Sequence, residues 1–473
     1  MPDIRYIALS DLHLGQDESL LTHIDADSGH AIPDAPSATL RALADCLREL
    51  ATQATGPGKP TLILNGDILE LALCDSDHAI RTFAQFIALL ARDGETVFDG
   101  IVYVPGNHDH HLWEMTRETQ YLNYMRRLAR IEDLEPAWHT TKLFATRRWK
   151  DRVAQATLTT VARKATGRED VEVLTAYPNF GVLGRDEPQG RPVLFHHGHF
   201  IEAVYHAMST AASLVFADHR IPSNVYALEE ENFAWIDFFW STMGRSGRVG
   251  ADVERLYEAT GDVSSLRQLT DSLARNLARR FRLFSSWNSL EEAVLRWLFR
   301  RVVARVAGGQ ERQRGAASRP LPLSEDAEKG LRWYLEGPLR NQVQAEQRPT
   351  PSEATFVFGH THRPFECVMQ STLAKEPVRI LNTGGWVVDT RTPRPEQGGA
   401  VALIGEDLSA VSLRLYNEGR YAVRVEEPLQ PSEPHGELWK QVHAAVRPDQ
   451  EPWRTFTETV AREAQARMRH FGR

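Results

Sequence analysis

The sequence reads GIVYVPGNHD from Gly100 to Asp109: a short apolar run followed at once by a cluster of polar residues. Four other apolar runs end in the same way. Their clusters hold Asp11 and His13, then Gly66 and Asp67, then His196 to His199, and finally His360 and His362. In open α/β sheets, residues at the carboxyl ends of the strands converge on one edge of the sheet. We therefore expect the five clusters to form a single site.

In the first third of the chain, segments with helical periodicity separate these runs. Leu40, Leu43, Leu47 and Leu50 predict a helix over Ser37–Thr52, and a second helix is expected over Ala79–Ala91. Strands that alternate with helices are typical of an α/β fold with helical crossovers. The expected strands are Ile4–Ser10, Thr61–Asn65, Gly100–Val104, Pro192–His196, Thr355–Phe358, Val378–Asn382, Ala400–Ile404 and Ser409–Tyr416.

The character of the sequence changes along the chain, which suggests insertions into a catalytic core. Residues 1–198 are expected to form the first part of the core, with a small helical insertion at about 113–167. Residues 199–350 are mostly helical in pattern and rich in Arg and aromatic residues, as in a large helical insertion or cap. The core resumes over 351–420. The tail, 421–473, is Pro-rich at first and then helical in pattern from Glu437 to Arg469.

Composition limits the class of protein. The 473 residues are 42% hydrophobic and 25% charged, which is ordinary for a soluble globular chain. A net charge of −8 gives no general field for attracting nucleic acid. Cys46, Cys74 and Cys367 are scattered, which disfavours a disulfide scaffold and indicates a reducing compartment. Neither a signal peptide nor an apolar stretch of about 18 residues is visible, so a cytoplasmic location is expected.

The residue types in the five clusters fit a pair of metal ions. Aspartate and histidine bind divalent transition metals through oxygen and neutral imidazole, and asparagine adds a carbonyl oxygen. No cysteine occurs among them, which disfavours a zinc-thiolate site. Asp11 and His13 are two residues apart, as are His360 and His362, so on an extended chain each pair points the same way. A central carboxylate such as Asp67 can bridge two cations.

The clusters resemble the blocks D-x-H, G-D, G-N-H-[DE], H and G-H-x-H of the calcineurin-like metallophosphoesterase superfamily. The resemblance covers about Ile4–Gly198 and Thr355–Tyr416 and implies a four-layer αββα sandwich. It implies two divalent ions, with manganese, iron, zinc and cobalt all compatible with such ligands. The implied ligands of one metal are Asp11, His13, Asp67 and His362, and those of the other are Asp67, Asn107, His197 and His360.

Some roles in the fourth cluster and beside the metals also come from the resemblance. His196, His197 and His199 compete for one ligand position, and the superfamily pattern of a ligand directly before Gly favours His197. His108 is implied to donate a proton to the leaving group, with Asp109 orienting it. His199 and Arg363 are the candidates for contact with substrate.

These assignments predict a phosphodiesterase or pyrophosphatase in which a metal-bridging hydroxide attacks phosphorus in line with the leaving oxygen. The alternatives are a nuclease of the same fold and a non-catalytic binding scaffold; the filled ligand positions disfavour the scaffold. Asn382-Thr383-Gly384-Gly385-Trp386 is similar to a segment of bacterial members that include UDP-2,3-diacylglucosamine hydrolases, which suggests a small or lipid-linked substrate. Those enzymes typically have Arg where this chain has His108.

The stretch Arg275–Arg305 alternates arginines with aromatic and aliphatic residues. Such a helix could lie on an anionic membrane surface, which would place the protein peripherally at a membrane. It could equally bury its apolar stripe within a cap domain and expose its arginines to solvent.

Overall fold

A computed structural model describes residues 3–54, 56, 58–92, 95–144, 153–183, 191–216, 218–242, 322–346, 349–427 and 436–470. The stretch Arg275–Arg305 lies outside these residues, so its predicted membrane or cap role stays a prediction. None of the helices in the described part is both long and apolar enough to cross a bilayer.

The larger of two main sheets has eight strands in the order β15-β14-β13-β1-β2-β5-β7-β6. From β1 to β7 the neighbouring strands are parallel, whereas β13 pairs with β1 in the antiparallel sense. The strands are β1 (Ile4–Leu9), β2 (Thr61–Leu64), β5 (Gly100–Tyr103), β6 (Val153–Ala154), β7 (Val173–Thr175), β13 (Gly398–Gly405), β14 (Ala410–Asn417) and β15 (Arg424–Val425).

The smaller sheet has five strands in the order β11-β12-β10-β9-β8. Its central strands β9, β10 and β12 are parallel, and β8 and β11 are antiparallel edge strands. The strands are β8 (Asn179–Val182), β9 (Val193–His196), β10 (Thr355–Phe358), β11 (Phe365–Met369) and β12 (Val378–Asn382). A separate two-stranded hairpin consists of β3 (Ala91–Arg92) and β4 (Glu95–Thr96).

The helices begin where the sequence supplies a cap and an apolar stripe. In α1, the Ser37 side chain accepts a hydrogen bond from the Leu40 amide, and the predicted leucines are all buried. The α-helices are α1 (Ala38–Thr52), α2 (Ser76–Leu89), α3 (His110–Arg127), α4 (Ala156–Thr166), α5 (Ala207–Val215), α6 (Val225–Ile236), α10 (Glu325–Tyr334), α11 (Arg340–Ala345), α12 (Glu437–Ala445) and α13 (Trp453–His470). Shorter turns are η1 (Ile131–Asp133), η2 (His199–Ile201), η3 (Ala203–His206), η4 (Asp237–Thr242) and η8 (Leu335–Leu339).

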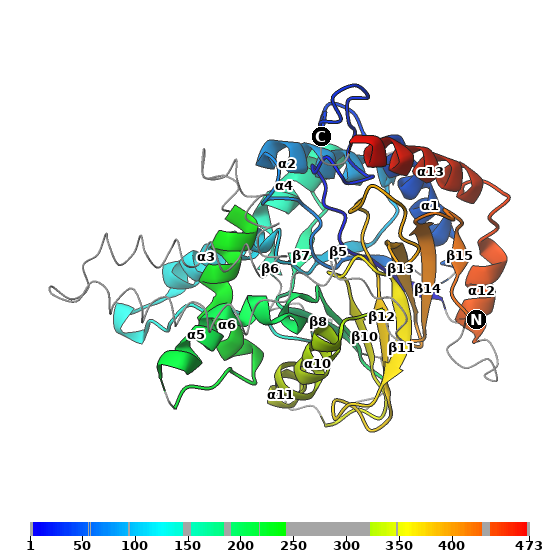
Figure 1. Cartoon of the computed structure of the whole chain (residues 1–473). Coiled ribbons are helices and arrows are strands. Elements are labelled where there is room, and N and C mark those ends of the chain that lie inside the picture. The colour runs from blue at the N-terminus through cyan, green and yellow to red at the C-terminus, as the bar shows by residue number, and fades with distance from the viewer. Residues whose placement is uncertain are drawn as a thin grey trace, which may run out of the picture.

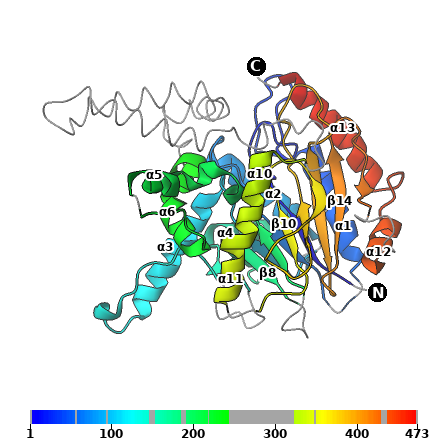
Figure 2. The same ribbon diagram turned by 60° about the horizontal axis from the view of Figure 1, so that its bottom comes forward.

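Three apolar clusters hold these elements together. The first joins one face of the larger sheet to α1, α2, α4 and α13, which Figure 1 shows together on one side. The second contains residues of both sheets, such as Ala8, Val102, Phe195 and Val357. The third joins the smaller sheet to α6 and α10 (Figure 2). Because both faces of the central strands are buried, they read as continuous apolar runs. The predicted α/β class is confirmed, with mixed sheets.

The tail is helical over most of the predicted range, as two helices, α12 and α13, with Pro448 and Pro452 between them. Proline has no amide N–H and its ring clashes with the preceding helical turn, which accounts for the break. Within the predicted insertion at 113–167, α4 packs against α2 as part of the first cluster.

The register of the strands positions the site. Leu9 of β1 pairs with Leu64 of β2, and Leu64 pairs in turn with Tyr103 of β5. The loops after these strands therefore leave the larger sheet at the same level. In the smaller sheet, Val357 of β10 is level with Phe195 of β9, so the loops that follow them also emerge together.

Candidate metal centre

The backbone of the candidate ligands is unusual. Five of the non-glycine residues with positive φ in the described part are Asp11, His13, Asp67, His360 and His362, with φ between +44° and +69°. Each such residue costs about 1–3 kcal/mol, and such residues cluster at functional sites. The expectation that both pairs of ligands lie on extended chain is therefore wrong. The loops turn sharply instead, and amide-to-carbonyl bonds of 2.9 Å from Asp11 to Gly66 and from His13 to Asp67 hold two of them together.

One group of ligand atoms consists of the side chains of Asp11, His13 and His362, all within 4.8 Å of one another. His13 Nε2 and His362 Nε2 are 3.2 Å apart. Asp11 Oδ1 lies 3.6 Å from His362 Nε2, and Asp67 Oδ2 lies 3.8 Å from His13 Nε2. The four side chains predicted for one metal thus lie close together, with polar atoms 3.2–3.8 Å apart.

A second group consists of Asp67, His197 and His360. His197 Nε2 lies 3.1 Å from Asp67 Oδ2, 3.1 Å from Asn107 Oδ1 and 3.2 Å from His360 Nδ1. Asp67 belongs to this group, and its Oδ2 atom also lies 3.8 Å from His13 Nε2 of the first group. His360 and His362 serve different groups, because the turn between them sends their side chains apart.

Three of the candidate histidines hydrogen-bond to carboxylates on the side away from the ligand groups. These bonds determine which ring nitrogen faces each group. Glu70 Oε2 lies 2.9 Å from His13 Nδ1, Asp389 Oδ2 lies 2.8 Å from His362 Nδ1, and Glu202 accepts from His360 Nε2. A histidine that donates its outer N–H to a carboxylate presents an unprotonated nitrogen inward. His13 and His362 would then aim two lone pairs at each other across 3.2 Å, which is favourable only with a cation nearby. The residues fit a metal pair.

The electrostatics of the second group also favour a cation. Burial lowers the pKa of His197, but the nearby Asp67 and Asp11 outweigh it and raise the pKa to about 9. Burial raises the pKa of Asp11 to about 7, whereas His197 and His108 overcome burial and hold that of Asp67 well below its usual range. A proton on His197 and a metal ion compete for the same negative field, so metal binding is expected to release protons.

His108 lies beside both groups, and its ring is held by Glu70 rather than by Asp109. His108 Nδ1 lies 2.9 Å from both Glu70 carboxylate oxygens. The Asp109 carboxylate instead accepts hydrogen bonds from the amides of Gly106 (2.7 Å) and Ile68 (2.8 Å). Asp109 thus shapes the two ligand loops. Glu70, three residues after Asp67, is not among the site residues predicted from the sequence.

A narrow pocket opens onto both groups. It is lined by Asp67, Asn107, His108, Glu202, Tyr205, His360 and His362. His199 and Arg363, the predicted substrate contacts, do not line it. His199 is fully buried, with its ring centroid 4.9 Å from that of His196 and 5.5 Å from that of Tyr205. Arg363 is 1% exposed. Both side chains are therefore buried outside the lining of this pocket, and their contact with substrate stays a prediction.

The segment Asn382–Trp386 supports the first group. The ring of His362 lies directly on Gly385, where a Cβ atom would come within 2.6 Å of the imidazole. The Thr383 hydroxyl is 2.6 Å from that of Ser10, which hydrogen-bonds to Asp11. The Trp386 ring is fully buried and packs edge-to-face on Phe456 of α13. The segment therefore forms the floor beneath His362 and Asp11.

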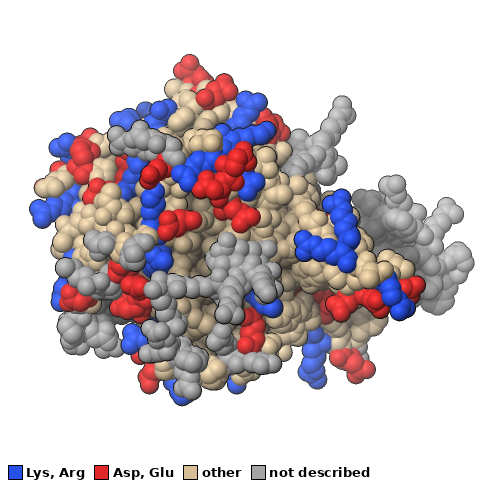
Figure 3. Space-filling view, turned by 180° about the vertical axis from the view of Figure 1, so that it is seen from behind, with Lys and Arg blue, Asp and Glu red and all other residues tan. Residues whose placement is uncertain are grey.

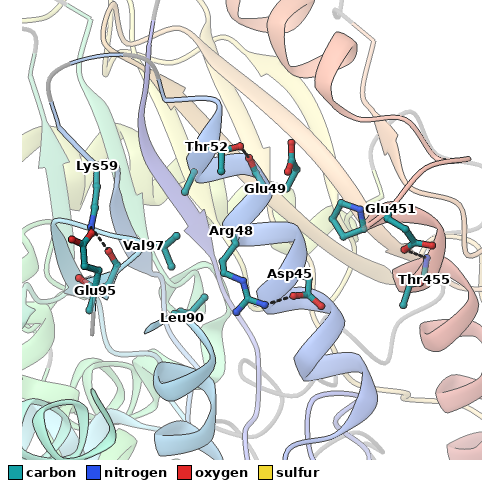
Figure 4. A pocket seen from close by; sticks show the side chains of 13 residues that line it. Asp45, Arg48, Glu49, Thr52, Lys59, Leu90, Glu95, Val97, Glu451 and Thr455 are labelled. Carbon is teal, nitrogen blue, oxygen red and sulfur yellow. Dashed lines mark hydrogen bonds and ion pairs between the residues drawn. The ribbon is translucent and has the colours of Figure 1, made fainter. Parts of the chain in front are cut away.

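A second hollow, of about 760 Å³, lies between α1, the β3–β4 hairpin and the start of α13 (Figure 4). Its cations are already paired: Arg48 with Asp45, and Lys59 with Glu95. It carries none of the candidate ligands.

Residues 4–231 match the family model described as calcineurin-like phosphoesterase. This match supports a metallophosphoesterase domain over residues 4–231, and side chains from this range form buried His/Asp clusters suited to metal ions together with His360 and His362, which lie beyond it. No curated protein matches the chain.

Proposed function

We propose that the protein is a binuclear metal-dependent phosphodiesterase or pyrophosphatase. One observation carries the proposal. Seven candidate ligands from five loops come together in two adjacent groups, with Asp67 in one group and 3.8 Å from His13 of the other, and His108 lines a pocket beside them. When bound, two divalent ions lower the pKa of a water molecule and polarise phosphoryl oxygens. Manganese, iron, zinc and cobalt all suit these nitrogen and oxygen ligands.

The protein's own residues would position the substrate and supply the proton. The bond between phosphorus and the leaving oxygen breaks as a water oxygen attacks, and the leaving oxygen needs a proton. Because Glu70 engages His108 Nδ1, that proton would come from Nε2. Water is the second reactant, so no covalent intermediate with the protein is required.

The lining of the pocket favours a diester over a monoester. Among the described residues, no lysine or arginine lines it, and Glu202 adds a carboxylate. A terminal phosphate carries about two negative charges and is commonly held by such cations. A phosphodiester carries one charge and has less need of them.

Nucleic acid is the weaker substrate class. On the face shown in Figure 3, lysine and arginine side chains are intermingled with aspartate and glutamate, as in an ordinary solvated surface. A continuous basic track, which a phosphate backbone requires, is not seen among the residues that Figure 3 colours by charge. The role of Asn382–Trp386 as a floor for His362 gives that segment a structural purpose, so the proposal does not extend to a particular lipid.

We also propose a layered architecture for the fold. The three apolar clusters support a four-layer αββα sandwich, and the helices between residues 199 and 350 would be an insertion that covers the smaller sheet.

The test uses the purified full chain with manganese and a panel of bis(p-nitrophenyl) phosphate, cyclic nucleotides and a UDP-linked lipid. We expect metal-dependent hydrolysis of at least one member, and a loss of about 10²-fold or more in Asp67→Asn. Absence of hydrolysis by metal-loaded protein, or an Asp67→Asn variant with full turnover, would overturn the proposal.

A further inference from the structure

The turn that carries His108 leads directly into α3, and this helix lacks a cap of its own. Asp109 occupies the N-cap position, but its side chain makes no capping bond. Its carboxylate is committed to the amides of Gly106 and Ile68. The first amides of a helix have no partner within the helix, and a buried amide without one costs about 1–3 kcal/mol. The missing acceptor must come from elsewhere in the fold.

Ser241, on the π-helical turn η4, supplies it. The His111 amide donates to the Ser241 hydroxyl oxygen at 3.0 Å, and this hydroxyl donates to the His108 carbonyl at 3.1 Å. Ser241 is fully buried. One hydroxyl thus joins the backbone on either side of the turn, from a residue 133 positions away in the sequence.

Ion pairs fix η4 and α6 against the start of α3. His110 Nε2 lies 2.9 Å from Glu229 Oε1, and His111 Nδ1 lies 3.1 Å from Asp237 Oδ1. The Tyr177 hydroxyl donates to the other Glu229 oxygen at 3.0 Å. Glu229 and His110 are fully buried, so neither can leave the other without a large desolvation cost. These contacts hold the Ser241 hydroxyl in place.

The neighbouring residue on η4, Trp240, packs on another residue of the pocket lining. The Trp240 ring packs on Tyr205 with centroids 5.0 Å apart, and Tyr205 lies edge-on to His360 at 5.3 Å. Tyr205 lines the pocket together with His108 and His360. In a π-helix, the wider turn lets successive residues serve different surfaces, and such turns occur frequently at functional sites.

We propose that Ser241 is a positioning residue for His108, so that the helical segment 225–242 is part of the reaction centre. The inference rests on the proposed function, in which His108 gives its proton to the leaving oxygen. A positioning role for Ser241 predicts a specific kinetic effect. Loss of the Ser241 hydroxyl must harm the hydrolysis of esters with poor leaving groups more than that of esters with good ones, because only the former depend on the proton.

The experiment compares diphenyl phosphate, whose phenolate leaves poorly, with bis(p-nitrophenyl) phosphate. For Ser241→Ala we expect kcat on diphenyl phosphate to fall by about 10-fold or more, and on bis(p-nitrophenyl) phosphate by less than about 3-fold. Ser241→Thr retains the hydroxyl and should restore most of the loss. Ser209→Ala is the matched control, because Ser209 is a buried serine that binds Asn232 between α5 and α6 without touching the His108 turn.

Equal losses on both esters, or a loss as large in Ser209→Ala, would refute a positioning role for Ser241. Asp237→Asn gives a second reading if Ser241→Ala does not fold: it should show the same dependence on the leaving group in weaker form, and its absence counts against the inference. If the wild-type protein hydrolyses neither ester nor any other panel member, the proposed function itself fails. The two failures are therefore distinguishable.

Discussion

Replacement of Glu70 by glutamine tests how the carboxylates behind the ligands work. Glu70 is fully buried and holds two imidazoles at once, through His13 Nδ1 and His108 Nδ1. Although burial opposes it, the two histidines hold the pKa of Glu70 well below its usual range, so the group is ionised. Glutamine keeps the shape but removes the charge and turns one of the two acceptors into a donor.

Two backbone hydrogen bonds determine which carboxylate oxygen of Glu70 is replaced by the glutamine NH2 group. Glu70 Oε1 accepts from the amides of Ala72 (2.8 Å) and Leu73 (2.9 Å), so the glutamine oxygen must stay at that position. The NH2 group then faces His13 Nδ1, which can no longer donate. The His13 proton must move to Nε2, the nitrogen that faces the first ligand group. Loss of such a supporting bond typically costs about 10- to 100-fold in metal affinity, or about 1.4–2.7 kcal/mol.

The assay is a calorimetric titration of the metal-free protein with Mn²⁺, followed by kcat measurements at saturating metal. Glu202→Gln is the matched control, because Glu202 supports His360 in the second group. We expect Glu70→Gln to weaken one binding step and Glu202→Gln the other. The reasoning is refuted if Glu70→Gln binds both equivalents as tightly as the wild type.

Three further predictions concern the surroundings of the site. Gly385→Ala would push a methyl group into the ring of His362. We therefore expect calorimetry to show about a 10-fold or greater loss of metal affinity. Wild-type affinity would contradict the support of His362 by Gly385. Arg467→Ala removes the donor to the buried carbonyls of Ser19 and Thr22. The free energy of unfolding in urea should therefore fall by about 2–3 kcal/mol. An unchanged urea midpoint would count against this contact. The pKa of His110 is raised to about 9, because its ion pairs with Asp237 and Glu229 outweigh burial. The stability that it contributes, about 3 kcal/mol, should be complete below pH 6.5 and lost as the pH rises through about 9. Urea unfolding across this pH range measures the effect. In Glu229→Gln the free energy of unfolding should fall less with rising pH than in the wild type. An equally steep fall would contradict the role of His110.

The strands β1, β2, β5, β9 and β10 were predictable because each is a short apolar run with a polar cluster at its end, whereas the internal strand β7 was not among the expected strands. Thr355–Phe358 and Val378–Asn382 have the predicted bounds. The edge strands had no such signal. In β11 exposed residues alternate with buried ones, and β8 includes Asn179 and Gly181, which are uncommon in strands.

The candidate ligands were predictable from the motifs, but their supporting carboxylates were not. Asp389 and Glu202 stand alone in the sequence, and they meet His362 and His360 only through tertiary packing. Glu70 was detectable in principle, since it follows Asp67 by three residues. The extended-chain argument failed because the ligand loops adopt positive φ, which alternation of side chains along a strand does not anticipate.

The metal centre is tested by counting and locating the metal ions in active protein, by elemental analysis and anomalous X-ray diffraction. We expect two divalent ions per chain, one beside His13 and His362 and the other beside His197 and His360. Active protein that holds one ion or none at this place, or in which Asp67→Asn retains both ions and full turnover, would contradict this expectation.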